Sequence, residues 1–218
     1  MAKRQKKKEV AAEQIKIAYE GYTIRYGTIP NDLVSFCSIS NIPEEDFEKH
    51  YGSLKILHMD IWKSYIVDTI NALAEDEQYG SFTVREQLLA FYYTHLEVLK
   101  SHREFIQVVN DEFKRPLPLP SFLKGYKEAF VDYGKQLIQA GLRTGEIADR
   151  KMLNRSYTNG LWAQLLFVVK FWLKDSSENL EKTDAAIEKA VSLSFELVRP
   201  GPIDSFVDFA KFIYQNRK

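Results

Sequence analysis

The stretch GTIPNDLVSFCSISNIPEEDFEKHYGSLKIL, residues 27–57, decides the fold of the N-terminal part of this chain. A helix predicted over about residues 10–26 precedes it and stops at Gly27. The stretch itself predicts two short helices, 31–38 and 43–51, with a tight turn between them. Three helices with a short turn before the last describe a helix-turn-helix unit, whose third helix enters the major groove of DNA.

The rest of the chain also has helical spacing. Apolar residues recur three or four positions apart, and alternating strand patterns are nearly absent. The prolines of KRPLPLPS, residues 114–121, interrupt the pattern because proline cannot continue a helix. The sequence therefore predicts an all-α protein of about ten helices, of which the last seven cover residues 54–74, 84–99, 103–113, 121–140, 149–173, 178–198 and 203–214.

The composition is that of an ordinary globular protein of one or two domains. The 218 residues are 45% apolar, and 30 basic side chains balance 30 acidic ones, so no global field draws the chain to nucleic acid. We expect residues 1–53 to form the helix-turn-helix domain with a basic N-terminal tail. Residues 54–218 are expected to form a larger helical bundle.

Two features indicate a cytoplasmic address. The single cysteine, Cys37, cannot form an intramolecular disulfide, and no apolar signal region follows the basic start. The longest apolar run, residues 161–173, contains Gln164 and Lys170 and is too short to span a bilayer. We expect no stable membrane insertion.

The residues of the stretch match a known pattern. Residues 27–57 resemble, without a gap, the DNA-binding domain of tetracycline-repressor (TetR) family regulators, although the same spacing also fits the core of any small helical bundle. The positions that carry the likeness are Leu33, Phe36, Cys37, Ser40, Ile42, Phe47, His50, Tyr51 and Leu57. The resemblance implies a TetR-like fold, a homodimer that binds double-stranded DNA, and a C-terminal domain for effector binding and dimerisation.

The third helix departs from the family pattern where DNA would lie. Residues 43–50 carry four acids against one lysine, and residues 9–60 carry nine acids against four bases. Acids at a helix start are favoured by the helix dipole, and acids can also accept hydrogen bonds from cytosine amino groups. Two alternatives remain. The domain has kept DNA binding, with phosphate contacts supplied by other residues, or it has lost DNA binding. The candidate DNA-binding residues are Lys3, Arg4, Lys6, Lys7, Lys8, Asn41, Glu44, Glu45, Asp46, Lys49, His50 and Lys55.

The larger bundle is rich in aromatic residues. Rings at helical spacing usually form core, but a bundle this aromatic could also leave an apolar pocket for a small molecule. The candidate pocket residues are Trp62, Tyr65, Phe91, Tyr92, Phe105, Tyr126, Phe130, Tyr133, Trp162 and Phe167. The last long helices are where TetR-like proteins pair, so the candidate dimer interface is Leu161, Leu165, Val168, Ile187, Val191 and Phe195.

A second resemblance concerns the C-terminal part, FWLKDSSENLEKTDAAIEKAVSLSFELV followed by IDSFVDFAKF. It is similar to the end of lipid-binding ubiquinone-biosynthesis proteins, which share the TetR fold without acting as repressors. This likeness favours an apolar effector. It also leaves open the alternative of a lipid or isoprenoid carrier that has lost DNA binding, and a protein-interaction module is a third hypothesis.

Motifs for catalysis are missing from the sequence. The four histidines are not grouped with cysteine or carboxylates at metal-ligand spacing, and no phosphate loop, nucleophile elbow or carboxylate pair occurs. We therefore expect no enzyme activity, no metal and no cofactor. The leading hypothesis is a ligand-responsive transcriptional regulator in which a filled pocket changes the separation of two recognition helices.

Overall fold

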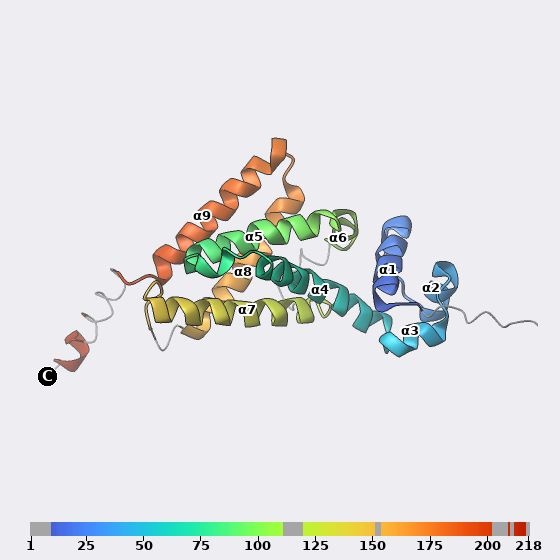
Figure 1. The fold of residues 1–218 in the computed structure, drawn as a ribbon, viewed down its shortest axis with the longest axis horizontal. Coiled ribbons are helices and arrows are strands. Elements are labelled where there is room, and N and C mark those ends of the chain that lie inside the picture. Colours follow the sequence, from blue (N-terminus) through green and yellow to red (C-terminus); the bar gives the residue numbers. More distant parts are fainter. Residues whose placement is uncertain (1–9, 111–119, 151–153, 202–208, 210–211, 217–218) are drawn as a thin grey trace, which may run out of the picture. The chain divides into compact units, whose positions relative to one another are not determined.

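The computed structural model describes residues 10–110, 120–150, 154–201, 209 and 212–216. Over these ranges the chain is helical, with no strand (Figure 1). The α-helices are α1 Ala12–Tyr26, α2 Leu33–Ser40, α3 Glu44–His50, α4 Leu54–Ala74, α5 Val84–Lys100, α6 Arg103–Val109, α7 Leu123–Thr144, α8 Asn154–Lys174 and α9 Glu181–Val198. Two 3-10 turns, η1 Tyr79–Ser81 and η3 Glu178–Leu180, stand between them.

The helices form two compact units, and each is discontinuous in sequence. The first unit comprises Met1–Val67 and Val98–Lys127, and the second comprises Asp68–Glu97 and Glu128–Lys218. The boundaries fall inside α4, α5 and α7. The functional division expected between residues 53 and 54 stays a prediction.

In the first unit, α1, α2 and α3 lie next to one another (Figure 1), and aromatic side chains pack between them. Tyr19 of α1 meets the ring of Phe36 of α2 edge-on, with ring centroids 5.9 Å apart. Phe36 in turn meets Phe47 of α3 at 6.2 Å. Cys37 of α2 is also buried. Edge-to-face pairs at this spacing add about 0.5–1.5 kcal/mol each to the stabilisation from burial.

Later helices complete the same unit. Phe105 of α6 lies 6.3 Å from Tyr19 and 5.9 Å from His58 of α4, centroid to centroid. The His58 ring also stacks on Phe122 at 4.4 Å, and Trp62 lies 5.6 Å from Tyr126 of α7. The core of the helix-turn-helix therefore continues without a break into residues contributed by α6 and α7.

Glu20 of α1 forms polar contacts with two other helices of the first unit. One of its carboxylate oxygens accepts from the Tyr65 hydroxyl of α4 at 2.8 Å. The other pairs with Nδ1 of His102, at the start of α6, at 2.7 Å. Because the three groups sit on three different helices, this cluster fixes the rotation of α1 against α4 and α6.

The second unit has its own aromatic core. Phe91 of α5 stacks on Tyr133 of α7, with centroids 4.5 Å apart, and meets Phe130 at 5.3 Å. The Tyr133 hydroxyl bonds to that of Tyr79 at 2.9 Å. Burial raises the pKa of Tyr133, so this phenol stays protonated at every physiological pH.

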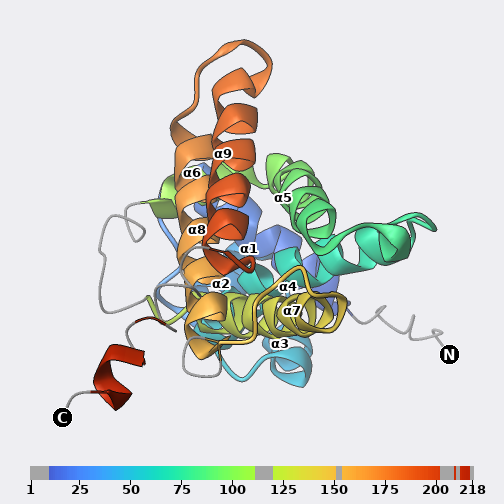
Figure 2. The same cartoon turned by 90° about the vertical axis from the view of Figure 1, so that its left-hand side faces the viewer.

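A hairpin of α8 and α9 forms one side of the second unit, and Figure 2 shows the two helices side by side. Asp175 closes the hairpin by accepting from the hydroxyls of Ser177 and Thr183, each at 2.6 Å. It also accepts from the backbone N–H groups of both residues. These bonds hold the pKa of the Asp175 carboxyl well below its usual range.

The predicted all-α class and the order of the helices are confirmed, with shifts at the helix ends. The first helix starts at Ala12 rather than near residue 10, and α7 runs four residues beyond the expected end. The 3-10 turn η1 was not predicted, because three residues are too few for a periodic signal. Most of the expected helix over 203–214 lies outside the described residues.

Burial of His58 predicts a pH-dependent stability. Its pKa is lowered from 6.5 to about 4, and its Nε2 accepts from the Trp62 indole at 3.0 Å, which requires the neutral ring. Between these two pKa values the unfolded chain binds more protons than the folded one, so falling pH destabilises the fold. We expect the free energy of unfolding to drop by on the order of 2–3 kcal/mol from pH 7 to pH 4 on this account.

Urea denaturation at fixed ionic strength across this range measures the effect. The variant His58→Gln should lose most of the slope, while His50→Gln, which changes an exposed ring, should keep it. Equal slopes for the wild type and His58→Gln would contradict the assignment.

Candidate nucleic-acid interface and ligand cavity

The turn between α2 and α3 is built by side-chain and backbone caps. Asp32 caps α2 by accepting from the Ser35 N–H at 2.8 Å. At the other end Asn41 has φ 54°, in the left-handed region that asparagine tolerates better than most residues. The Ile42 N–H then bonds back to the Cys37 carbonyl at 2.9 Å. The result is the short turn expected from the sequence.

The two sides of α3 differ sharply. On the inner side Phe47 is fully buried, and Tyr51, just beyond the helix, donates its hydroxyl to Asp60 of α4 at 3.1 Å. On the outer side Glu44, Glu45 and Glu48 are exposed. The structure therefore presents outward most of the acids that made this helix unusual.

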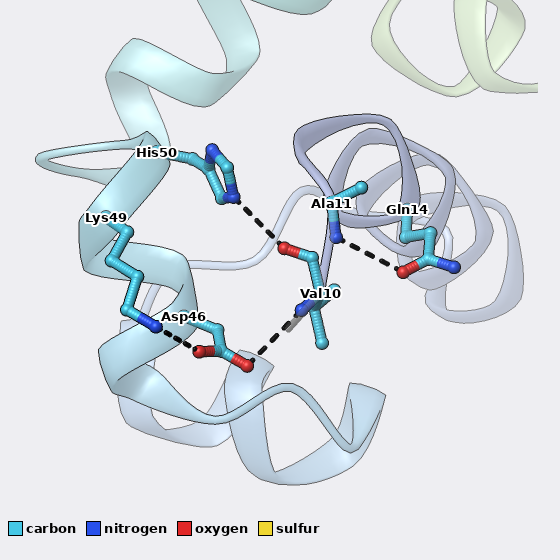
Figure 3. Close-up of polar contacts among 6 residues, drawn as sticks. All are labelled: Val10, Ala11, Gln14, Asp46, Lys49 and His50. Carbon is cyan, nitrogen blue, oxygen red and sulfur yellow. Dashed lines mark hydrogen bonds and ion pairs between the residues drawn. The ribbon is translucent and has the colours of Figure 1, made fainter. Parts of the chain in front are cut away.

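Asp46 and His50 take part in a contact that sequence reasoning missed (Figure 3). Asp46 Oδ2 accepts from the Val10 N–H at 3.4 Å, and His50 Nε2 lies 3.0 Å from the Val10 carbonyl oxygen. The other Asp46 oxygen pairs with Lys49 at 2.9 Å. We call these bonds to Val10 the α3 clasp. No sequence signal marks it, because the partner is backbone some forty positions away.

The remaining candidate DNA-binding residues are distributed as follows. Lys55 is exposed near the start of α4, and Asn41 is exposed in the turn. The tail residues Lys3, Arg4, Lys6, Lys7 and Lys8 lie outside the described residues. The α3 side chains, Lys55 and the turn therefore share one small region of the first unit, and their contact with DNA stays a prediction.

The aromatic residues expected around a pocket are mostly packed core. Trp62, Tyr65, Phe105 and Tyr126 belong to the first unit, and Phe91, Tyr92, Phe130, Tyr133 and Trp162 belong to the second. All nine are buried against other side chains, and none lines the cavities described below. Phe167 instead points outward and is 50% exposed. Large rings close the space between helices, because they interdigitate.

An apolar cavity of about 330 Å³ lies elsewhere in the second unit. Its walls come from α5, α7, α8, α9 and the loop before α8, and they include Leu88, Leu137, Ile138, Ile147, Tyr157, Leu161, Phe195 and Val198. Arg150 lies on this wall and donates to the Leu197 carbonyl at 2.7 Å and the Arg199 carbonyl at 3.1 Å. The cavity is near the lower end of the roughly 300–1,000 Å³ usual for ligand pockets.

Most of these lining residues were not singled out in the sequence. Leu161 and Phe195 were singled out, but as candidates for the dimer interface. Branched aliphatic side chains at helical spacing look the same whether they fill a core or line a cavity. Only the three-dimensional packing decides which gap stays open.

Four of the six candidate interface residues are buried within one chain. Leu165 and Val168 of α8 and Ile187 and Val191 of α9 expose almost no surface. The apolar stripe that the hairpin buries therefore differs from the apolar stripe that it turns to solvent. The outward stripe, which we call the α8–α9 face, surrounds an open groove of about 850 Å³ and consists of Ala163, Phe167, Ala186, Ala190, Leu193 and Leu197.

Two further features of the described residues concern metal ligands and membrane-spanning helices. These residues contain no group of three or more histidine, cysteine or acidic side chains that could hold a metal ion. Across the same part of the chain, no helix is both long and apolar enough to cross a membrane. Of the histidines, His95 is buried and bonds to Thr69 at 2.8 Å, and His102 pairs with Glu20.

An N-terminal helix-turn-helix with its third helix exposed, followed by a larger helical part, has the architecture of a helical transcription regulator. The family model for the tetracyclin repressor-like C-terminal domain matches residues 87–213, more than half of the chain. The chain therefore belongs to the tetracycline repressor-like (TetR) family. No curated protein matches its sequence.

Solved structures show the same fold. A candidate TetR-family transcription regulator from Shewanella sp. PV-4 has a TM-score of 0.62 at 11% identity, covering 87% of this chain and 98% of that one. A second candidate TetR-family regulator, from Syntrophomonas wolfei, has a TM-score of 0.62 at 13% identity. This match covers 85% of this chain and 93% of that one. The reduced form of NemR from E. coli has a TM-score of 0.50 at 14% identity. This match covers 88% of this chain and 99% of that one. At these identities the likeness establishes the fold. The similarity to ubiquinone-biosynthesis proteins stays a prediction.

Proposed function

We propose that this protein is a transcription regulator that binds double-stranded DNA as a homodimer and responds to an apolar small molecule. The observation that carries the proposal is the two-sided α3. Its apolar side is fixed to the core by Phe47, and its polar side faces outward after a turn of three residues. In helix-turn-helix proteins this arrangement places the third helix in the major groove.

The charge on α3 defines how DNA would be held. Glu44, Glu45 and Glu48 repel phosphates, so cations elsewhere must supply the affinity. The candidates are the five cations of the N-terminal tail in the sequence and the exposed Lys55. The exposed glutamates can still accept hydrogen bonds from cytosine amino groups, which gives them a role in selecting bases.

A salt titration against a random-sequence 30-base-pair duplex tests DNA binding. We expect the logarithm of the affinity to fall linearly with that of the salt concentration, with a slope of about −0.9 per phosphate neutralised. Deleting residues 1–8 should weaken binding and flatten the slope by about 0.9 for each phosphate that the tail had neutralised.

The control replaces residues 1–8 by a glycine–serine segment of equal length, and it should behave like the deletion. A wild-type dimer that binds no duplex at low salt would refute the proposal. Binding with an unchanged slope after the deletion would refute only the tail's role.

The α8–α9 face supports the homodimer. Phe167, Leu193 and Leu197 are each at least half exposed, and they stand among alanines that let a second helix pair approach closely. A two-fold pair buries the same face from both chains, and two recognition helices then read two half-sites.

Charge placed on this face should prevent pairing. We expect the wild type to sediment at twice the chain mass of 25.4 kDa and Leu193→Glu with Phe167→Glu to sediment at the single-chain mass. The matched control is Ile17→Glu on α1, which changes an equally exposed apolar residue away from the face. A wild type that stays at the single-chain mass at micromolar concentration would overturn the homodimer.

The apolar cavity supports the effector. Its walls are almost entirely hydrocarbon, so a ligand would be held by burial of its own apolar surface, worth about 25 cal/mol per Å². For regulation, the ligand must prefer the conformation with the lower DNA affinity, since equal affinity for both conformations shifts nothing. We also infer a cytoplasmic location, where such a protein would meet DNA.

Filling the cavity should abolish ligand uptake. We expect the neutral dye N-phenyl-1-naphthylamine to bind the wild type with increased fluorescence and Leu161→Trp to bind at least tenfold more weakly, because the added ring occupies the space. Phe167→Trp, which enlarges an exposed ring outside the cavity, is the control and should bind like the wild type. Equal dye binding by all three proteins would exclude this cavity, and circular dichroism melting checks that each variant is folded.

A further inference from the structure

The α3 clasp joins the third helix to the chain at the start of α1. Val10 is held at both of its main-chain groups, its N–H by Asp46 at 3.4 Å and its carbonyl by His50 at 3.0 Å (Figure 3). Lys49 pairs with the second Asp46 oxygen at 2.9 Å and so orients the carboxylate. Two attachment points fix the direction of a chain, whereas a single bond leaves it free to rotate.

The next residue continues the fixed path. The Ala11 N–H donates to the Gln14 side chain at 3.2 Å, and α1 begins at Ala12 (Figure 3). Val10 therefore lies in a short ordered bridge between α3 and the first turn of α1. Backbone groups at helix ends can be satisfied by water or by side chains, and here side chains of α3 bond to both groups of Val10.

The residues that precede Val10 in the sequence form the basic tail. Lys3, Arg4, Lys6, Lys7 and Lys8 lie within seven positions of it, and a chain extends at most about 3.3–3.6 Å per residue. Seven residues of fully extended chain span at most about 25 Å. Tethering at a fixed point raises the effective concentration of charge at a neighbouring phosphate without adding a new contact.

We propose that Asp46 and His50 are positioning residues for the basic tail. They hold Val10 against α3, so that the tail leaves the fold beside the helix that faces DNA. This role rests on the proposed DNA binding and gives two residues that were expected to contact DNA a different task. It also explains why an acid is useful at position 46 of a helix that faces a polyanion.

The clasp can be tested without DNA, through tryptic cleavage after Lys8, two residues before Val10. Losing the bond from Asp46 should raise the cleavage rate about fivefold in Asp46→Ala, as expected for one hydrogen bond of typical strength. Asp46→Asn keeps an acceptor and should cleave nearly as slowly as the wild type. Glu48→Ala removes the same charge from the same helix, outside the clasp, and should not change the rate. Equal rates in all four proteins would overturn the proposal.

The positioning role is then tested by duplex affinity, with and without residues 1–8. Removing a negative charge from α3 should by itself strengthen binding, so Asp46→Ala is compared with Glu48→Ala rather than with the wild type. In the full chain we expect Asp46→Ala to bind about fivefold more weakly than Glu48→Ala. Without residues 1–8 the two variants should bind equally, because the tail that Asp46 positions is gone.

The remaining outcomes separate the two proposals. A difference that persists without residues 1–8 would show that Asp46 acts directly on DNA, and it would overturn the positioning role while supporting DNA binding. No duplex binding by the wild type would overturn the proposed function, and the positioning role with it.

Discussion

The left-handed backbone at Asn41 is the constraint on which the helix-turn-helix depends. At φ 54° this residue ends α2 and sends the chain back, so that the Ile42 N–H bonds to the Cys37 carbonyl. A right-handed residue here would extend α2 and carry Phe47 away from Phe36. Because the left-handed region costs most residues roughly 1–2 kcal/mol, the choice of asparagine lowers the cost of the turn.

The acids of α3 have different structural roles despite their similar appearance in sequence. Asp46 is partly buried and bonded to Val10, and it is paired with Lys49. Glu44, Glu45 and Glu48 face outward, and the first two lie where the helix dipole favours negative charge. A net charge counted along the sequence treats these residues alike. The structure shows that one of the four is bonded to a distant part of the chain, while the other three are exposed.

Much of the fold could be predicted from the sequence because it depends on local patterns. The helices, the turn and the buried positions Phe36, Phe47 and Tyr51 follow from apolar spacing and turn chemistry. The α3 clasp could not be predicted, since backbone atoms have no sequence signature. The cavity and the α8–α9 face were also beyond the sequence, because Leu165 and Leu193 have the same apolar character, yet one is fully buried and the other is 57% exposed. A helix with apolar residues on two stripes does not reveal which stripe its own chain will cover.

The discontinuous first unit has a consequence for how the protein is made. Tyr19 and His58 complete their packing only against Phe105 and Phe122, which are synthesised after the whole of Asp68–Glu97. When only the first 67 residues have been synthesised, the chain therefore contains only part of the core that surrounds α1. The core of the first unit therefore cannot be completed during translation before both α6 and Phe122 have been synthesised.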